Sequence, residues 1–182
     1  MVNLFNPRYF TPLIITEMQQ AFAKDHQLVL PQFLRQAFLE ALLEKITRAH
    51  WEHDYVPDEH SFHRARFAFP TRLIAPFVSL VAGPIKLVSA EVLTLGHRDY
   101  TILHDDKPQD VIECILPLMP YDERWGGRVV YRTEADASVI LPQQNQLSLV
   151  RTGKRKRFVQ YVNHHVKNNG IMLVVLTFQK SR

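Results

Sequence analysis

Between residues 86 and 178 the sequence alternates short runs rich in β-branched and aromatic residues with residues that form turns. The runs lie at residues 86–95, 99–104, 110–118, 127–133, 137–141, 146–151, 157–163 and 170–178. The breaks between them contain glycine, proline, asparagine and aspartate, which favour a turn over a continued strand. So many short strands in succession predict a β-sandwich or a jelly roll.

The part of the chain before residue 84 shows a helical pattern instead. A capping box at residues 16–19 predicts the start of a first helix, and apolar residues at helical spacing predict a second helix over residues 31–50. A third helix is predicted over residues 71–82, before a Gly-Pro pair. We therefore expect one domain over residues 1–182, with residues 1–83 as a mainly helical support and residues 84–182 as the β core.

The composition excludes several classes of protein. With 46% hydrophobic and 22% charged residues, the chain is not expected to be disordered or fibrous. No apolar run reaches the roughly 18 residues of a membrane span, and the first residues lack a secretory signal pattern. The single cysteine, Cys114, excludes an intramolecular disulfide and lies in an apolar run, where we expect a buried, unreactive thiol. These features predict a cytoplasmic protein with no membrane partner.

The charge balance gives a weak preference for anionic partners. The net charge is +4, and Lys154–Arg157 form a basic run that is followed by Phe158 and Tyr161. In a nucleic-acid-binding protein, such cations would contact phosphates and the aromatic rings would stack on bases. One short run is a small electrostatic footprint, however, and Thr152-Gly153 precedes it. We therefore favour a solvated hairpin turn, and nucleic acid is the less favoured partner.

The most informative stretch for chemistry contains His104 and Asp106. Residues two apart at the end of a strand project to the same face, so this imidazole and carboxylate converge. They would supply two of the three ligands of a 2-His-1-carboxylate site, which holds Fe(II) and leaves coordination positions open. Taken alone, the pair is more typical of a solvated turn, because Asp105-Asp106 is followed by Lys107-Pro108.

The order of motifs along the chain favours the metal site. The helices are followed by His104-x-Asp106, Trp125-Gly126-Gly127, Pro142-x-x-Asn145 and two closing strands. Over residues 27–178 this order resembles the 2-oxoglutarate/Fe(II)-dependent dioxygenases, and within them the prolyl-4-hydroxylase-like branch. The resemblance implies an α+β, mainly β fold, namely a double-stranded β-helix (jelly roll) with N-terminal helices packed on one sheet. It also implies the cofactors Fe(II) and 2-oxoglutarate, allows ascorbate, and suggests hydroxylation of a substrate such as a protein or peptide side chain.

The second half of the implied iron site departs from the family pattern. Where the family has His-x-Val-x-x-Val, the segment in register here begins with Arg157, and a guanidinium cannot ligate iron. Under the resemblance the third ligand is then His164 or His165, with His165 favoured because it shares strand parity with Val159. The alternative is a site that has lost iron, in a catalytically inactive protein that acts as a binding or regulatory module.

The resemblance also assigns roles around the metal. Lys167 would hold the far carboxylate of 2-oxoglutarate, and Tyr100 or Thr101 would hydrogen-bond this co-substrate. The segment around residues 49–66 is expected to be a loop over the mouth of the β-helix that contacts substrate. Its candidate substrate-binding residues are Trp51, Tyr55, His60, Arg64 and Arg66, with Trp125 from further along the chain. A zinc site at His50, His53, His60 and His63 is disfavoured, because no cysteine lies near and the two pairs are on separate elements.

Overall fold

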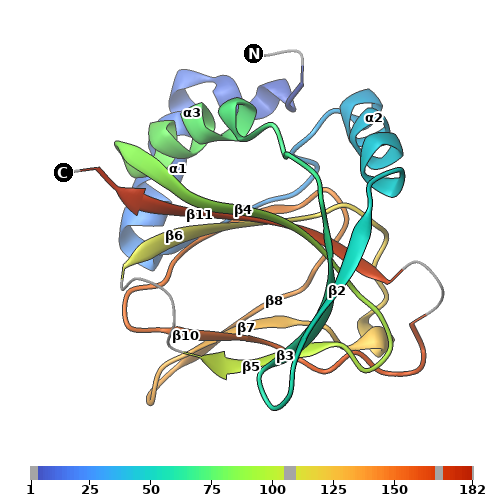
Figure 1. Ribbon diagram of the computed structural model, residues 1–182. Helices are drawn as coiled ribbons and strands as arrows, with labels where there is room; N and C mark the ends of the chain where they lie inside the picture. Colours follow the sequence, from blue (N-terminus) through green and yellow to red (C-terminus); the bar gives the residue numbers. More distant parts are fainter. Residues whose placement is uncertain (1–3, 105–109, 167–169, 182) are drawn as a thin grey trace.

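The computed structural model describes residues 4–104, 110–166 and 170–181 (Figure 1). The helical elements are η1 (Pro7–Phe10), α1 (Pro12–Asp25), α2 (Gln36–Thr47), α3 (Thr71–Ala82) and η2 (Glu123–Trp125). The strands are β1 (Gln27–Leu30), β2 (Trp51–Val56), β3 (His60–Ala65), β4 (Ile85–Leu95), β5 (Tyr100–His104), β6 (Val111–Pro117), β7 (Val129–Arg132), β8 (Ala137–Ile140), β9 (Leu147–Arg151), β10 (Lys156–Val159) and β11 (Ile171–Lys180).

The strands form one antiparallel sheet that curls on itself, called the barrel below. Its order is β1-β9-β6-β11-β4-β3-β5-β10-β7-β8, and β2 pairs with β3 at the side. The half that contains β6, β11 and β4 lies beneath the helices, and the half that contains β3, β5, β10 and β7 lies opposite (Figure 1). The expected α+β, mainly β jelly roll with helices on one sheet is therefore confirmed.

The predicted strands are found within a few residues of their expected bounds, but the segment around residues 49–66 corrects the prediction. It is not a loop over the barrel mouth: β2 and β3 form a hairpin, and β3 pairs with both β4 and β5. Phe62 is buried in the barrel interior, whereas Ala65 is buried beneath the helices. This alternation places β3 within the wall of the barrel.

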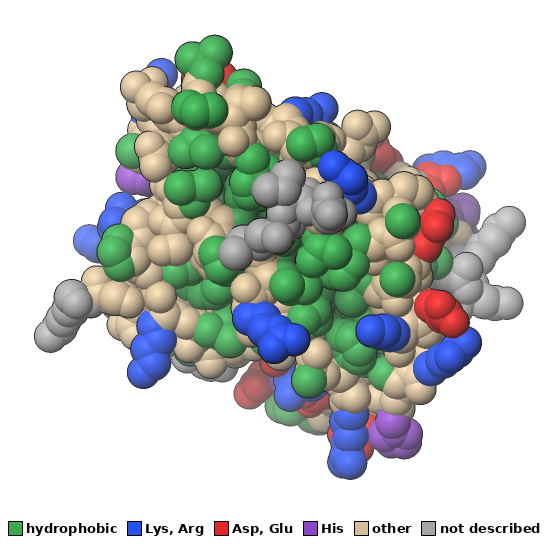
Figure 2. Space-filling model, turned by 90° about the horizontal axis from the view of Figure 1, so that it is seen from above, with side chains coloured by type: hydrophobic (Ala, Val, Ile, Leu, Met, Phe, Trp, Pro, Cys, Tyr) green, Lys and Arg blue, Asp and Glu red, His purple; other side chains and the backbone are tan. Residues whose placement is uncertain are grey.

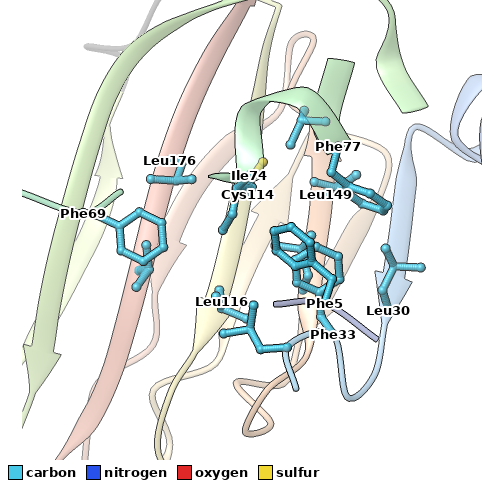
Figure 3. Packing of buried hydrophobic residues seen from close by; sticks show 14 of the residues in the cluster. Phe5, Leu30, Phe33, Phe69, Ile74, Phe77, Cys114, Leu116, Leu149 and Leu176 are labelled. Carbon is cyan, nitrogen blue, oxygen red and sulfur yellow. The ribbon is translucent and has the colours of Figure 1, made fainter. Parts of the chain in front are cut away.

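Aromatic side chains join the helices to the outer face of the sheet. The ring of Phe33 lies 5.0 Å from that of Phe5 and 4.9 Å from that of Phe77, which comes from α3. Figure 3 shows these three rings together, with Leu149 beside Phe77, and Ile74 of α3 close to Cys114. The burial predicted for Cys114 is confirmed, and burial raises the pKa of its thiol well above the usual value.

Seen from the helical side, hydrophobic side chains gather in the middle of the molecule (Figure 2). None of the helices in the described ranges is long and apolar enough to cross a membrane.

A second cluster of buried hydrophobic residues fills part of the barrel interior, with Leu93, Ile115, Val129 and Val175 among its members. The half of the sheet that contains β6, β11 and β4 thus has an apolar layer on each of its two faces. The layer inside the barrel bounds the candidate site.

Asn145 ties the chain before α2 to the loop before β9. Its backbone has a φ of 58°, in the left-handed region that asparagine tolerates better than most residues. Its side-chain oxygen accepts from the Leu34 N–H and its amide donates to the Leu34 carbonyl, both at 2.8 Å. Both partners are buried, so this side chain satisfies backbone groups that water cannot reach.

We expect Asn145→Ala to lower the free energy of unfolding by about 3 kcal/mol. The change leaves a buried N–H and a buried carbonyl unpaired and places alanine at a positive φ. Urea unfolding measures the loss, and Gln143→Ala at an exposed position of the same loop is the control, with a change of about 0.5 kcal/mol or less. Equal losses in the two variants would contradict this role of Asn145.

Candidate functional site

The barrel interior holds a cavity of about 200 Å³ between its two halves. Strands β3, β4, β5, β10 and β11 contribute to its wall, and strand alternation aims the polar side chains inward. Its floor is apolar and includes Leu93, Ile115 and Val175. The polar lining residues are Glu59, His60, Arg64, Glu91, Thr101 and Arg157.

The deep polar cluster of the barrel consists of Glu113, Tyr131 and Arg157. The Glu113 side chain, on β6, is 0% exposed. The Tyr131 hydroxyl donates to Oε2 of Glu113 at 2.6 Å, and Nη1 of Arg157 lies 3.4 Å from Oε1. A carboxylate is tolerated at this depth because a guanidinium and a hydroxyl donor face it from β10 and β7.

A second polar cluster lies nearer to solvent, on β2, β3 and β4. Nη2 of Arg64 is 2.9 Å from Oδ2 of Asp54 and 3.1 Å from Oε1 of Glu91. Nε2 of His60 lies 3.0 Å from the other oxygen of Asp54. These side chains are between 22% and 47% exposed, so their ion pairs are partly screened by water.

The electrostatics of the deep cluster keep Arg157 charged and Tyr131 neutral. Burial by itself lowers the pKa of Arg157, but the charge of Glu113, followed by Tyr131 and Glu91, outweighs it and raises that pKa. Burial, followed by the charge of Glu113, raises the pKa of Tyr131 well above its usual value. Arg157 therefore acts as a permanent cation, and Tyr131 acts as a hydrogen-bond donor.

The residues present do not fit a three-ligand iron centre with a ligand from β10. His104 ends β5, and its Cα partner across the β5–β10 ladder is Arg157. The residue of β10 that lies beside the end of β5 is therefore Arg157. A guanidinium cannot bind the metal, and this one is bound to Glu113. Nowhere in the described ranges do three His, Cys, Asp or Glu side chains come together so that they could hold a metal.

The two alternative third ligands lie at the other end of β5. His164 and His165 are exposed in a turn that follows Val162, and Val162 donates its N–H to the carbonyl of Asp99, just before β5. The ring of His164 lies 6.4 Å from that of His97. His104 is at the opposite end of that strand, so the structure does not bring His164 or His165 to it. Asp106 and Lys167, together with the side chain of His104, lie outside what the structure describes.

The other predicted site residues are spread over several places in the structure. Thr101, His60 and Arg64 line the cavity, and the Thr101 hydroxyl accepts from the Val159 N–H at 2.7 Å. Trp51 packs against the hydrophobic cluster beneath the helices, and Tyr55 is exposed and stacks on His53. Tyr100 pairs with Ser61 on β3, while Trp125 contacts Tyr121 near the turn that carries His164. Arg66, also predicted here, is exposed and paired with Glu52.

Glu91, Glu113 and Tyr131 were not among the residues that the sequence predicted for the site. The sequence did contain a signal for Glu113, because it is the one charged residue in the apolar run over residues 111–118.

The prediction for the basic run over residues 154–157 also needs a correction. Lys154 lies in the expected turn, whereas Arg157 points into the barrel and is 11% exposed. Strand alternation separates Arg157 from its exposed neighbour Lys156.

Comparison with known proteins shows the fold. No family model matches the chain. No curated protein sequence matches it either. An oxidoreductase of the 2OG-Fe(II) oxygenase family from Burkholderia pseudomallei matches 92% of this chain and 91% of its own, with a TM-score of 0.74 and 12% identity. A Trichoplax adhaerens prolyl hydroxylase, solved with a hypoxia inducible factor peptide fragment, matches 91% of this chain and 89% of its own, with a TM-score of 0.72 and 13% identity.

A third structure, HygX from Streptomyces hygroscopicus with nickel, 2-oxoglutarate and hygromycin B bound, covers 91% of this chain and 87% of its own. Its TM-score is 0.64 at 12% identity. The chain therefore has the double-stranded β-helix fold of the 2-oxoglutarate/Fe(II) oxygenases, and prolyl hydroxylases are among the proteins that share it. A fold shared at such low identity does not by itself fix the chemistry of the site.

We expect Glu113→Leu to cost about 3–5 kcal/mol of unfolding free energy, because it leaves the Arg157 guanidinium buried without its carboxylate. The double variant Glu113→Leu, Arg157→Leu removes both charges and should be more stable than Glu113→Leu alone. Urea unfolding of the wild type, both single variants and the double variant measures the coupling. Additive losses would show that the two side chains do not depend on each other.

Tyr131 should remain un-ionised above pH 10 for as long as the barrel is folded. Because its pKa is raised relative to the unfolded chain, its contribution to stability is complete below about pH 10 and falls as the pH rises further. Tyrosinate absorbance should therefore show that Tyr131 ionises only when denaturant unfolds the protein at alkaline pH. Tyr131→Phe should lack this step, and an unchanged titration in that variant would contradict the assignment.

Proposed function

We propose that the protein is a small-molecule-binding module built on the double-stranded β-helix and lacks the three-ligand iron centre of the oxygenases that share its fold. The observation that carries this proposal is the position of Arg157, directly opposite His104 and paired with Glu113. A metal placed there would meet a permanent cation, and moving Arg157 away would leave Glu113 buried without its partner. The cavity beside this pair is the binding site that we propose.

A second candidate function is that of a 2-oxoglutarate- and Fe(II)-dependent oxygenase that hydroxylates a substrate such as a protein or peptide side chain. The shared fold favours it, together with the place of His104 at the end of a barrel strand. In this case His104, Asp106 and His165 (or His164) hold the iron, and Lys167, Tyr100 and Thr101 bind the co-substrate. The proposed substrate-binding residues are Trp51, Tyr55, His60, Arg64 and Trp125. Ascorbate as a further cofactor and a cytoplasmic location stay predictions.

An anaerobic titration with Fe(II) and 2-oxoglutarate separates the two functions. We expect no saturable charge-transfer band from the wild type, because Arg157 stands where β10 would supply a ligand. Visible absorption spectroscopy is the measurement, with circular dichroism to show that the fold persists. A saturable band that His104→Ala abolishes would overturn the binding-module proposal and establish the oxygenase.

The same argument predicts that a metal site can be created. The double variant Glu113→Gln, Arg157→His places an imidazole opposite His104 and removes the charge of Glu113. We expect it to bind Co(II) at least about tenfold more tightly than Glu113→Gln alone, because an imidazole is a metal ligand and a guanidinium is not. Equal Co(II) affinity in the two variants would show that Arg157 is not what prevents metal binding.

A further inference from the structure

The charges around the barrel cavity alternate in sign, with one ion pair between neighbouring strands and one across the barrel. Arg64 of β3 pairs with Glu91 of β4, and Arg157 of β10 pairs with Glu113 of β6. Arg64, Glu91 and Arg157 all line the cavity, so the two pairs form one charged network around the same space. Each of the two guanidiniums therefore already has a carboxylate partner.

Several buried polar atoms next to this network have no hydrogen-bond partner. Nε of Arg157 is one, and the hydroxyls of Thr177 and Ser148 are two more. Thr177 lies directly opposite Glu113 in the β6–β11 ladder and Ser148 lies opposite Ile115 in the β6–β9 ladder, so both share the inner face of the barrel. Buried polar groups are almost always hydrogen-bonded in a functional protein. Of these three residues Arg157 lines the cavity, so its Nε is the donor that a polar ligand in the cavity would satisfy.

The balance of charge restricts the chemistry of that ligand. The two guanidiniums and their two carboxylate partners already balance, so a dianion or a cation would add net charge to a buried site. A ligand with one positive and one negative group matches an alternating network without adding net charge to a buried site. Its carboxylate would accept from Nε of Arg157, and its ammonium group would donate to Glu91.

The size and the apolar floor of the cavity restrict the rest of the ligand. About 200 Å³ is below the usual range for drug-sized ligands, so only a few heavy atoms fit. Leu93, Ile115 and Val175 offer branched aliphatic surface to a side chain. We propose that the cavity binds a free α-amino acid in its zwitterionic form, with a small aliphatic side chain. This inference rests on the proposed function, because it takes the cavity as the ligand site.

L-valine, isovalerate and isobutylamine test the proposal, since isovalerate lacks the ammonium group and isobutylamine lacks the carboxylate. We expect L-valine to raise the thermal midpoint of the wild type in a saturable way and to bind in calorimetry. Each analogue should bind at least about tenfold more weakly, which is the effect of losing one charge-assisted hydrogen bond. Tighter binding of 2-oxoglutarate or isovalerate than of L-valine would overturn the proposal and identify an anion site.

Glu91→Gln is the informative variant, because the Glu91 side chain is 27% exposed and its replacement keeps the shape of the cavity. We expect it to weaken L-valine at least about tenfold while leaving isovalerate unchanged. Glu123→Gln, at an exposed site outside the cavity, is the matched control and should bind L-valine as the wild type does. An equal effect of the two variants would overturn the role of Glu91.

The two proposals fail separately. A charge-transfer band with Fe(II) and 2-oxoglutarate would refute the binding module whatever L-valine does. An absent band together with no saturable response to L-valine would refute only the zwitterion site, because the iron centre would still be missing.

Discussion

The ion pair between Glu113 and Arg157 is the interaction on which the interior of this barrel depends. Glu113 belongs to β6, in the half of the sheet that lies under the helices, whereas Arg157 and Tyr131 belong to β10 and β7 in the opposite half. The cluster therefore connects the two halves across the interior. Neither charge is stable there without the other, because a buried carboxylate or guanidinium that loses its partner must pay its full desolvation cost.

The same pair decides which chemistry the fold can support. The chain has the double-stranded β-helix fold of the 2-oxoglutarate/Fe(II) oxygenases, and His104 ends the strand that faces Arg157. A guanidinium at that position offers positive charge and hydrogen bonds in place of a lone pair. Because a fold can be shared without its site, the residue at this position, and not the fold, decides what β10 can bind.

The strands that were predicted correctly and the hairpin that was missed have separate physical causes. The strands over residues 86–178 were predictable because alternation of apolar residues and turn chemistry are local properties of the sequence. The hairpin formed by β2 and β3 was missed because its residues are largely polar: His60 and Arg64 line a polar interior, and His53 and Tyr55 face solvent. An inward-facing strand that lines a polar cavity does not show the apolar alternation on which such predictions rest.

The sequence by itself determined the succession of strands over residues 86–178, the burial of Cys114 and the presence of a residue that cannot ligate a metal at position 157. Only the tertiary structure decided that Arg157 faces inward, that Glu113 and Tyr131 meet it, and that His164 and His165 lie at the far end of β5. The reason is that secondary structure follows from periodicity along the chain, whereas the site is made of strands that are far apart in sequence. Their neighbours across the barrel are set by the order and register of the sheet, which no local pattern encodes.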